Sequence, residues 1–193
     1  MMPGTPQVCP TCGAVVSAPL VRGEGEWNQG WRVGVPAGQQ FRPYPEGLIA
    51  DVVAKDGTVV EQQQGPIPRF RIHQCERVYG PMAWLFNETT AHADQRLVVA
   101  TSPGRPLVRY RWFQARETIE ACTRPVYLDL GPSPVADGLH MLLLAQVRRQ
   151  PKPKWLEGSG QLYTAAAFHS WVVHGFALTP WVPEVQRTRR RAA

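Results

Sequence analysis

Short stretches of alternating hydrophobic and polar residues are the main pattern along this chain. The alternation predicts strands over residues 15–21, 27–35 and 69–73 in the first part, and over 107–113 and 126–130 further on. The sequence also contains 19 prolines and 17 glycines, which interrupt it too often for long helices. The pattern therefore predicts a mainly β fold.

Two Asp-Gly pairs give the clearest turn signals. Asp56-Gly57 separates two apolar runs within residues 48–60, and both central positions of a type I′ turn favour residues that tolerate positive φ, so a hairpin is expected here. Asp137-Gly138 precedes residues 139–147, whose composition suits a helix but whose length and preceding turn suit a buried strand. We favour the strand. Residues 161–178 form another long β-prone segment.

Helical patterns are few. Residues 90–96 are compatible with a short helix, and residues 114–122 with a couple of helical turns, so at most one or two short helices are expected. We predict a small β lobe over residues 1–80 with the hairpin as an insertion, an antiparallel β-sandwich over 81–182, and a basic tail over 183–193.

Cysteine and histidine residues suggest a metal site. Cys9 and Cys12 have two residues between them, in a knuckle that presents both sulfurs to one point, and His73 and Cys75 follow about sixty residues later at the end of a predicted strand. Ligands of this type suit a closed, structural zinc site. Cys122 is an alternative fourth ligand in place of His73, or else a small buried hydrophobic residue.

The knuckle at residues 9–13, the β-rich insertion and the returning H-Q-C together resemble a zinc ribbon, of a kind seen in small proteins of GC-rich bacteria and their phages. The family usually closes with C-x-x-C, and its insertion is usually shorter. The resemblance implies bound zinc and a role as a nucleic-acid-binding element or a structural clip. A second resemblance is to the last hairpin of immunoglobulin-like sandwiches. It rests on the strand after Asp137-Gly138, the loop that follows this strand and the closing segment that contains a tryptophan.

Positive charge is concentrated near the end of the chain. The net charge is +6, and four of these charges come from the tail arginines, which are Arg187, Arg189, Arg190 and Arg191. Such a tail suits nucleic acid, an acidic protein surface or an anionic membrane, or it is a solvated terminus. Residues 107–113 also alternate arginine with aromatic residues, which fits either a nucleic-acid surface or a strand that buries its aromatics and exposes its arginines.

Motifs of common enzymes are missing from the sequence. There is no Walker loop, G-x-G-x-x-G turn, H-E-x-x-H helix or G-x-S-x-G elbow. His92 and Asp94 do not form a catalytic pair on a helix, because residues two apart face away from each other. A role outside catalysis is therefore expected.

Targeting signals are also missing at the start of the sequence. The first eight residues lack the features of a secretory signal, and the longest apolar run, residues 141–145, is too short to span a membrane. We expect a protein made in the cytoplasm that does not act on membranes.

We expect a structural component of a large assembly that contacts other subunits, such as a minor capsid, decoration or tail protein of a phage virion. The alternative is a nucleic-acid-binding zinc-ribbon protein that uses its basic tail.

Overall fold

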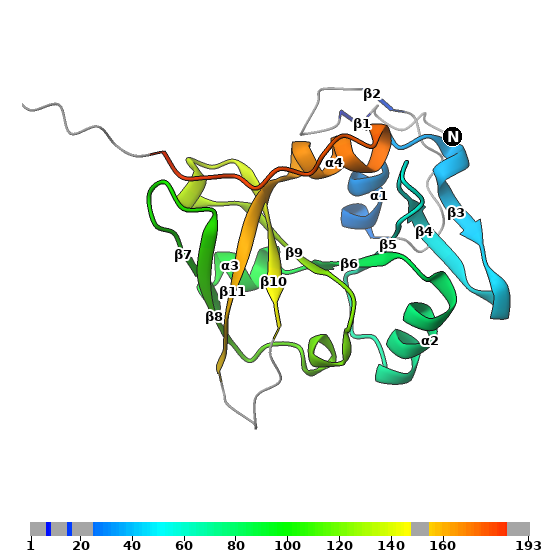
Figure 1. Ribbon diagram of the computed structural model, residues 1–193, viewed down its shortest axis with the longest axis horizontal. Coiled ribbons are helices and arrows are strands. Elements are labelled where there is room, and N and C mark those ends of the chain that lie inside the picture. The colour runs from blue at the N-terminus through cyan, green and yellow to red at the C-terminus, as the bar shows by residue number, and fades with distance from the viewer. Residues whose placement is uncertain (1–6, 9–14, 17–24, 148–154, 185–193) are drawn as a thin grey trace, which may run out of the picture.

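One continuous β-sheet dominates the fold (Figure 1). The computed structural model describes residues 7–8, 15–16, 25–147 and 155–184. Nine strands form the sheet in the order β3-β4-β5-β6-β9-β10-β11-β8-β7. They are β3 (Gln40–Pro43), β4 (Ile49–Val53), β5 (Val59–Gln63), β6 (Met82–Asn87), β7 (Leu97–Ala100), β8 (Leu107–Phe113), β9 (Val126–Pro132), β10 (His140–Gln146) and β11 (Trp155–Thr164). β1 (Gln7–Val8) and β2 (Val15–Val16) pair separately. The prediction of a mainly β fold is confirmed.

Helices cover both faces of the sheet. The four α-helices of the described residues, where one or two were expected, are α1 (Glu26–Arg32), α2 (Arg69–Tyr79), α3 (Thr89–Ala93) and α4 (Ala165–His174). Four 3-10 turns accompany them, namely η1 (Ala37–Gln39), η2 (Pro45–Gly47), η3 (Glu117–Ala121) and η4 (Pro134–Ala136). α1 and α4 pack on one face of the sheet, against a cluster that includes Leu85, Tyr127 and Leu142. α2, α3 and η3 pack on the other, larger cluster.

The sheet is mixed, which differs from the antiparallel sandwich expected from the sequence. β6 pairs in parallel with both β5 and β9, while the other neighbours are antiparallel. A parallel pair needs a crossover connection, and α2 supplies it between β5 and β6. The sheet therefore continues across the domain boundary expected at residue 80, with β5 on one side and β6 on the other.

The strand predicted over residues 69–73 is wrong, because this segment begins helix α2. The buried residues of α2 are Ile72, Cys75, Glu76 and Tyr79, which follow the spacing of one helix face. Pro68 lies at the N-cap and Gly80, with a φ of 72°, ends the helix. Residues 69–73 are too few to distinguish the spacing of a helix face from the alternation of a strand.

Two other segments predicted to be strands, residues 27–35 and 161–178, are mostly helical. In α1, which replaces most of the strand predicted over 27–35, Trp27 and Trp31 are four residues apart and pack on the same side against the sheet. Within residues 161–178, β11 ends at Thr164, whose hydroxyl accepts a hydrogen bond from the Ala167 N–H and caps α4. Gly175, with a φ of 74°, ends α4.

Both Asp-Gly predictions locate real turns. β4 and β5 form the expected antiparallel hairpin, although only Gly57 of the first pair has positive φ, at 88°. Asp137 and Gly138 both have positive φ, at 51° and 81°, and lead into β10, so the strand prediction for this segment is confirmed. The strand over 126–130 is also confirmed, as part of β9.

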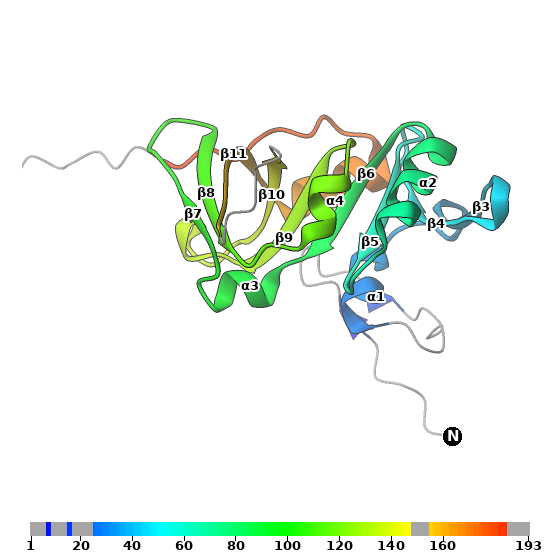
Figure 2. The same cartoon turned by 90° about the horizontal axis from the view of Figure 1, so that it is seen from below.

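The far end of the sheet curls around its larger core, as Figure 2 shows for β9, β10, β11, β8 and β7. Tyr110 and Trp112 of β8 point into this core beside Leu97 and Leu156. β11 passes close over Tyr110, because a Cβ atom at Gly158 would lie 2.6 Å from the Tyr110 hydroxyl oxygen. The opposite side of β8 and β11 is left facing outward.

Candidate functional site

The two described residues of the predicted zinc site lie on opposite sides of α2. Cys75 is buried in the larger core at 2% exposure, whereas His73 is exposed to solvent. Residues two apart on a helix do not face each other, so this geometry does not favour His73 and Cys75 as ligands of one ion. Cys9 and Cys12 lie outside the described residues, and the zinc site as a whole stays a prediction.

The buried thiols have little tendency to ionise. Burial raises the pKa of Cys75 to about 11 and that of Cys122, which packs against the same core, to about 12. Zinc binds the thiolate, so a raised pKa opposes metal binding. In the part of the chain that the structure describes, no three His, Cys, Asp or Glu residues are placed to share a metal ion.

Asp129 is the most heavily engaged polar group on the α1 face. Its carboxylate is fully buried and accepts hydrogen bonds from the indole N–H groups of Trp27, at 2.7 Å, and Trp31, at 2.9 Å. The other carboxylate oxygen accepts the Gly131 N–H at 2.8 Å and contacts His140 Nε2 at 2.6 Å. Asp129 thereby ties α1 to the end of β9 and to β10.

This histidine and carboxylate resemble part of a catalytic triad, but they lack a nucleophile. Among the described residues, His140 forms no hydrogen bond with a hydroxyl or a thiol, and its ring contacts the Trp31 ring edge-on at a centroid distance of 5.6 Å. A general base needs its target group within hydrogen-bond reach. What the contacts show is that Asp129 anchors α1 through Trp27 and Trp31.

Glu76 performs a comparable role on the α2 side. Its carboxylate accepts hydrogen bonds from the Trp84 indole, from both the hydroxyl and the N–H of Thr123, and from the Arg124 N–H. Burial by itself would raise the pKa of Glu76, but these hydrogen bonds outweigh it and lower the pKa. Glu76 is charged and fully partnered, and it joins α2 to the start of β9.

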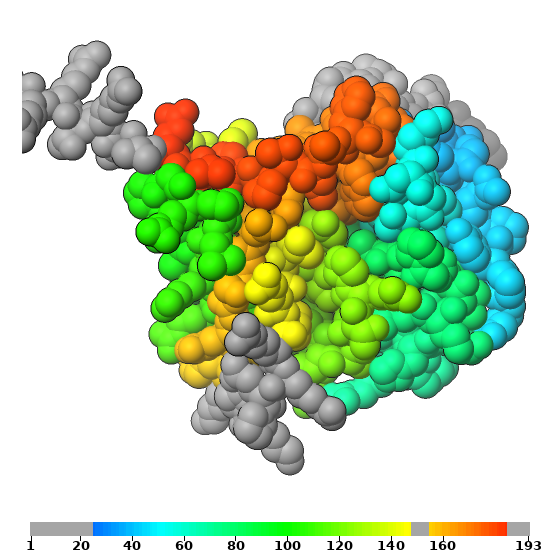
Figure 3. Space-filling view, viewed as in Figure 1, coloured from blue at the N-terminus to red at the C-terminus, as the bar shows by residue number. Residues whose placement is uncertain are grey.

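The outward side of β8 and β11 is the main exposed surface that combines arginine with aromatic side chains. Arg109 and Arg111 are exposed there, whereas Tyr110 and Trp112 are buried, as the second interpretation of residues 107–113 predicted. Trp155 of β11 is 39% exposed and adds an aromatic ring that the pattern of β8 alone does not reveal. We call the outward side of β8 and β11 the open face, and Figure 3 shows these strands below the C-terminal segment.

Two rings on the open face are in contact with each other, at an interplanar angle of 46°. Phe113 and Trp155 are direct cross-strand neighbours, and their ring centroids are 4.9 Å apart. The Arg111 guanidinium lies 5.1 Å from the Trp155 ring centroid and forms an ion pair with Glu157 at 2.8 Å. These contacts hold Trp155 in place while leaving part of its ring accessible.

Arg109 on the open face and Arg105 in the β7–β8 turn have no acidic partner among the described residues. The cross-strand neighbours of Arg109 are Ala100 and Ser159, neither of which is charged. The open face can therefore attract a polyanion.

Two further basic segments are connected to the open face along the chain. The sequence between β10 and β11 contains Arg148, Arg149, Lys152 and Lys154 and directly precedes Trp155. At the other end, the Pro183 carbonyl accepts the Gly104 N–H at 3.0 Å, which brings the start of the arginine tail to the β7–β8 turn. Residues 148–154 and 185–193 themselves lie outside the described residues.

Charge divides the chain into two unequal parts. Residues 94–113, 147–161 and 179–193 hold twelve basic and three acidic residues, a charge of +9. The remainder holds nine basic and twelve acidic residues, a charge of −3. Eight of the twelve basic residues belong to residues 148–154 and 185–193, outside the described part of the chain, and the described residues of these ranges carry a charge of +1.

Comparisons with known proteins identify no relative. No protein-family model, curated protein or solved structure matches this chain. None of the helices in the described part of the chain is long and apolar enough to cross a membrane.

Proposed function

We propose that this protein binds single-stranded nucleic acid on the open face. The supporting observation is that Arg109, which forms no ion pair with any described residue, and the accessible, pre-positioned ring of Trp155 lie on one sheet surface, and that basic segments precede and follow its strands in the sequence. Proteins that bind single strands use this pairing, in which bases stack on aromatic side chains and basic groups neutralise phosphates.

Each group has a separate task in this proposal. Trp155, supported by Phe113, offers a ring on which a base stacks. Arg109 and, in the β7–β8 turn, Arg105 contact phosphates, and the basic side chains of residues 148–154 and 187–191 supply further phosphate contacts. A single strand is favoured over a duplex because the bases of a duplex are already stacked and cannot reach the ring.

Salt dependence of binding to an oligothymidine tests the proposal. Fluorescence anisotropy with a labelled strand of about 20 nucleotides should show binding that weakens with salt, with a slope of log affinity against log salt of roughly −0.7 per neutralised phosphate. Truncation after Gln186 removes four arginines and should reduce the slope by about 3.

A pair of matched double variants locates the site. Arg105→Gln with Arg109→Gln should reduce the slope by about 1.4, whereas Arg69→Gln with Arg77→Gln, the same change in charge made on α2, should leave it unchanged. The proposal is wrong if the intact protein does not bind the oligothymidine at low salt. Equal losses in the two double variants would likewise contradict it, since binding would then follow net charge alone.

The role as a structural component of a phage virion stays a prediction from the sequence. It is compatible with nucleic-acid binding, because a virion protein that contacts the packaged genome needs the same chemistry. Co-purification of the chain with other virion subunits is the measurement that would support that second function.

A further inference from the structure

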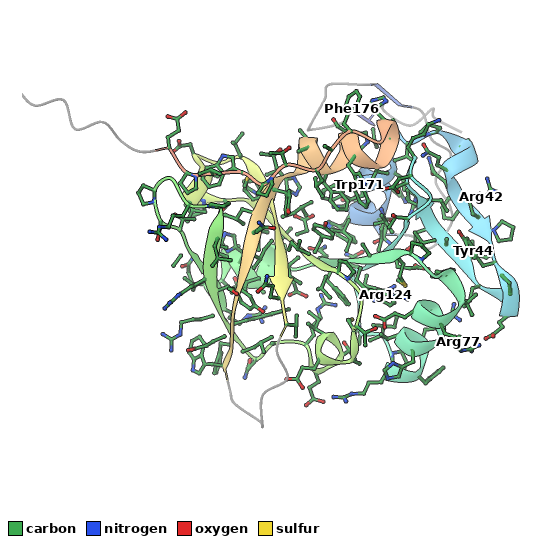
Figure 4. The ribbon with its side chains drawn as sticks, viewed as in Figure 1. Arg42, Tyr44, Arg77, Arg124, Trp171 and Phe176 are labelled. Atoms are coloured by element: carbon green, nitrogen blue, oxygen red, sulfur yellow. The ribbon has the colours of Figure 1, made fainter. Side chains whose placement is uncertain are left out.

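A pocket of about 410 Å³ lies at the opposite edge of the sheet from the open face. It is formed by η1, β3, the end of β4 and the last turn of α4. Figure 4 shows Arg42 on β3, Tyr44 directly after this strand, and Trp171 on the nearby α4. Its lining residues are Pro36, Gly38, Gln39, Arg42, Pro43, Tyr44, Val53, Ala54, Lys55 and Val173.

The lining of the pocket is positively charged. Arg42 and Lys55 are the only charged residues among the described residues that line it, and neither forms an ion pair within the described part of the chain. One nitrogen of the Arg42 guanidinium donates to the Gly38 carbonyl at 2.9 Å, which leaves its other N–H groups available. Asp56, the acidic residue next to Lys55, already accepts hydrogen bonds from Trp171 and Thr58.

The walls of the pocket are fixed by contacts outside it. The Val172 carbonyl near the end of α4 accepts the Lys55 N–H at 2.8 Å and the Gln39 side-chain amide at 3.3 Å. The Tyr44 ring contacts Tyr79 edge-on at a centroid distance of 4.8 Å. The pocket is therefore largely formed before any ligand arrives, as small-molecule sites usually are.

We propose that this pocket binds a small organic phosphate ester. A phosphate monoester carries between one and two negative charges near neutral pH and matches two cations, and the planar fork of arginine suits phosphate oxygens. Tyr44, the two prolines and Val173 supply an apolar wall for the organic part. The C-terminal end of α4 carries partial negative charge, which stabilises a nearby cation and explains why Lys55 lies there. Arg42 is on β3, and this effect does not explain its position.

This site is independent of the proposed nucleic-acid interface. The pocket lies at β3 and the open face at β8 and β11, which are at opposite ends of the strand order. Variants in one region therefore leave the residues of the other unchanged, and either proposal can fail without the other.

Titration of the intact protein with phenyl phosphate, followed by NMR or calorimetry, tests the pocket. We expect one saturable site per chain, with inorganic phosphate binding more weakly because it lacks the organic part. Arg42→Gln should weaken binding of phenyl phosphate by about tenfold, the usual effect of losing a charge-assisted hydrogen bond. Lys55→Gln provides a second variant, with a weaker binding expected for the same reason.

Arg77→Gln serves as the matched control, because Arg77 is exposed and pairs with Glu46 outside the pocket. It should bind phenyl phosphate as the unaltered chain does. No saturable binding of phenyl phosphate, or binding by both pocket variants within about twofold of the unaltered chain, would overturn the proposal.

Discussion

The surroundings of Asp129 and the open face use polar groups in opposite ways. Asp129 is fully buried, and both of its oxygens are engaged by groups from α1, β9 and β10. On the open face, Arg109 is exposed and forms no ion pair with any described residue, and Trp155 keeps 39% of its surface accessible. The hydrogen-bonding capacity of Asp129 is thus used within the protein, whereas Arg109 and Trp155 remain available to a ligand.

This difference separates the polar groups that stability requires from those that are available to a ligand. A buried charge without partners is costly, so complete pairing around Asp129 is what stability demands and carries no information about ligands. Unpaired arginine on an exposed sheet costs little, and nothing in the fold requires it. The open face is consequently the better guide to function, although Asp129 and His140 look more like an active site.

The largest expected effect comes from removing the carboxylate. Asp129→Ala leaves two indole N–H groups and the Gly131 N–H without their acceptor, and should lower the free energy of unfolding by about 3–5 kcal/mol. Urea denaturation measures this loss. Asp94→Ala, at an exposed carboxylate, should change the free energy by less than about 0.5 kcal/mol. A loss below about 1 kcal/mol for Asp129→Ala would mean that α1 is held mainly by its apolar contacts.

A pH titration of stability tests a second buried carboxylate. Burial raises the pKa of Glu88 from 4.5 to about 7, although its ion pair with Arg116 acts in the opposite direction. The folded state therefore binds the proton more tightly, so this contribution to stability is present below pH 4.5 and is lost as the pH rises to about 7, by up to about 3 kcal/mol.

Glu88→Gln isolates this effect. Glu61 has a raised pKa too, through burial and the nearby Asp51, and adds to the same trend, so the quantity to measure is the difference between the two proteins. The stability of the variant should decrease less between pH 4.5 and 7 than that of the unaltered chain. Parallel pH profiles would contradict the raised pKa of Glu88.

The open face should show the opposite behaviour, with an effect on binding that exceeds the effect on folding. Trp155→Ala removes the stacking ring and should weaken oligothymidine binding by about 1–3 kcal/mol. The free energy of unfolding should change by about 1 kcal/mol or less, because the ring is 39% exposed. Trp181→Ala removes a tryptophan that packs against the core, so it should lower the free energy of unfolding more than it weakens oligothymidine binding.

The smallest effect is expected for the ion pair on the open face. Arg111 and Glu157 are 64% and 54% exposed, and exposed ion pairs contribute little. Arg111→Gln should alter the midpoint of urea unfolding by an amount equivalent to less than about 0.5 kcal/mol. A larger loss would indicate that the ion pair helps to hold the two strands together, and would weaken the contrast with Asp129.

The sequence by itself determined the features that depend on nearest neighbours in the chain. The alternation in β8 placed Arg109 and Arg111 on one side and the rings of Tyr110 and Trp112 on the other, because side chains of a strand alternate between its two faces. Asp137-Gly138 located the turn before β10, since its backbone conformation is a local property. The mainly β composition followed from the same local patterns.

The tertiary structure alone decided which of these segments became helices and which residues distant in the sequence came into contact. Trp27 and Trp31 read equally well as part of a strand, and it is their packing on Asp129, about a hundred residues away, that stabilises the short helix α1. Cys75 and His73 were separated because α2 had to bury one side against the core. Trp155 joined Phe113 only through the pairing of β11 with β8, a long-range contact that no local pattern in the chain encodes.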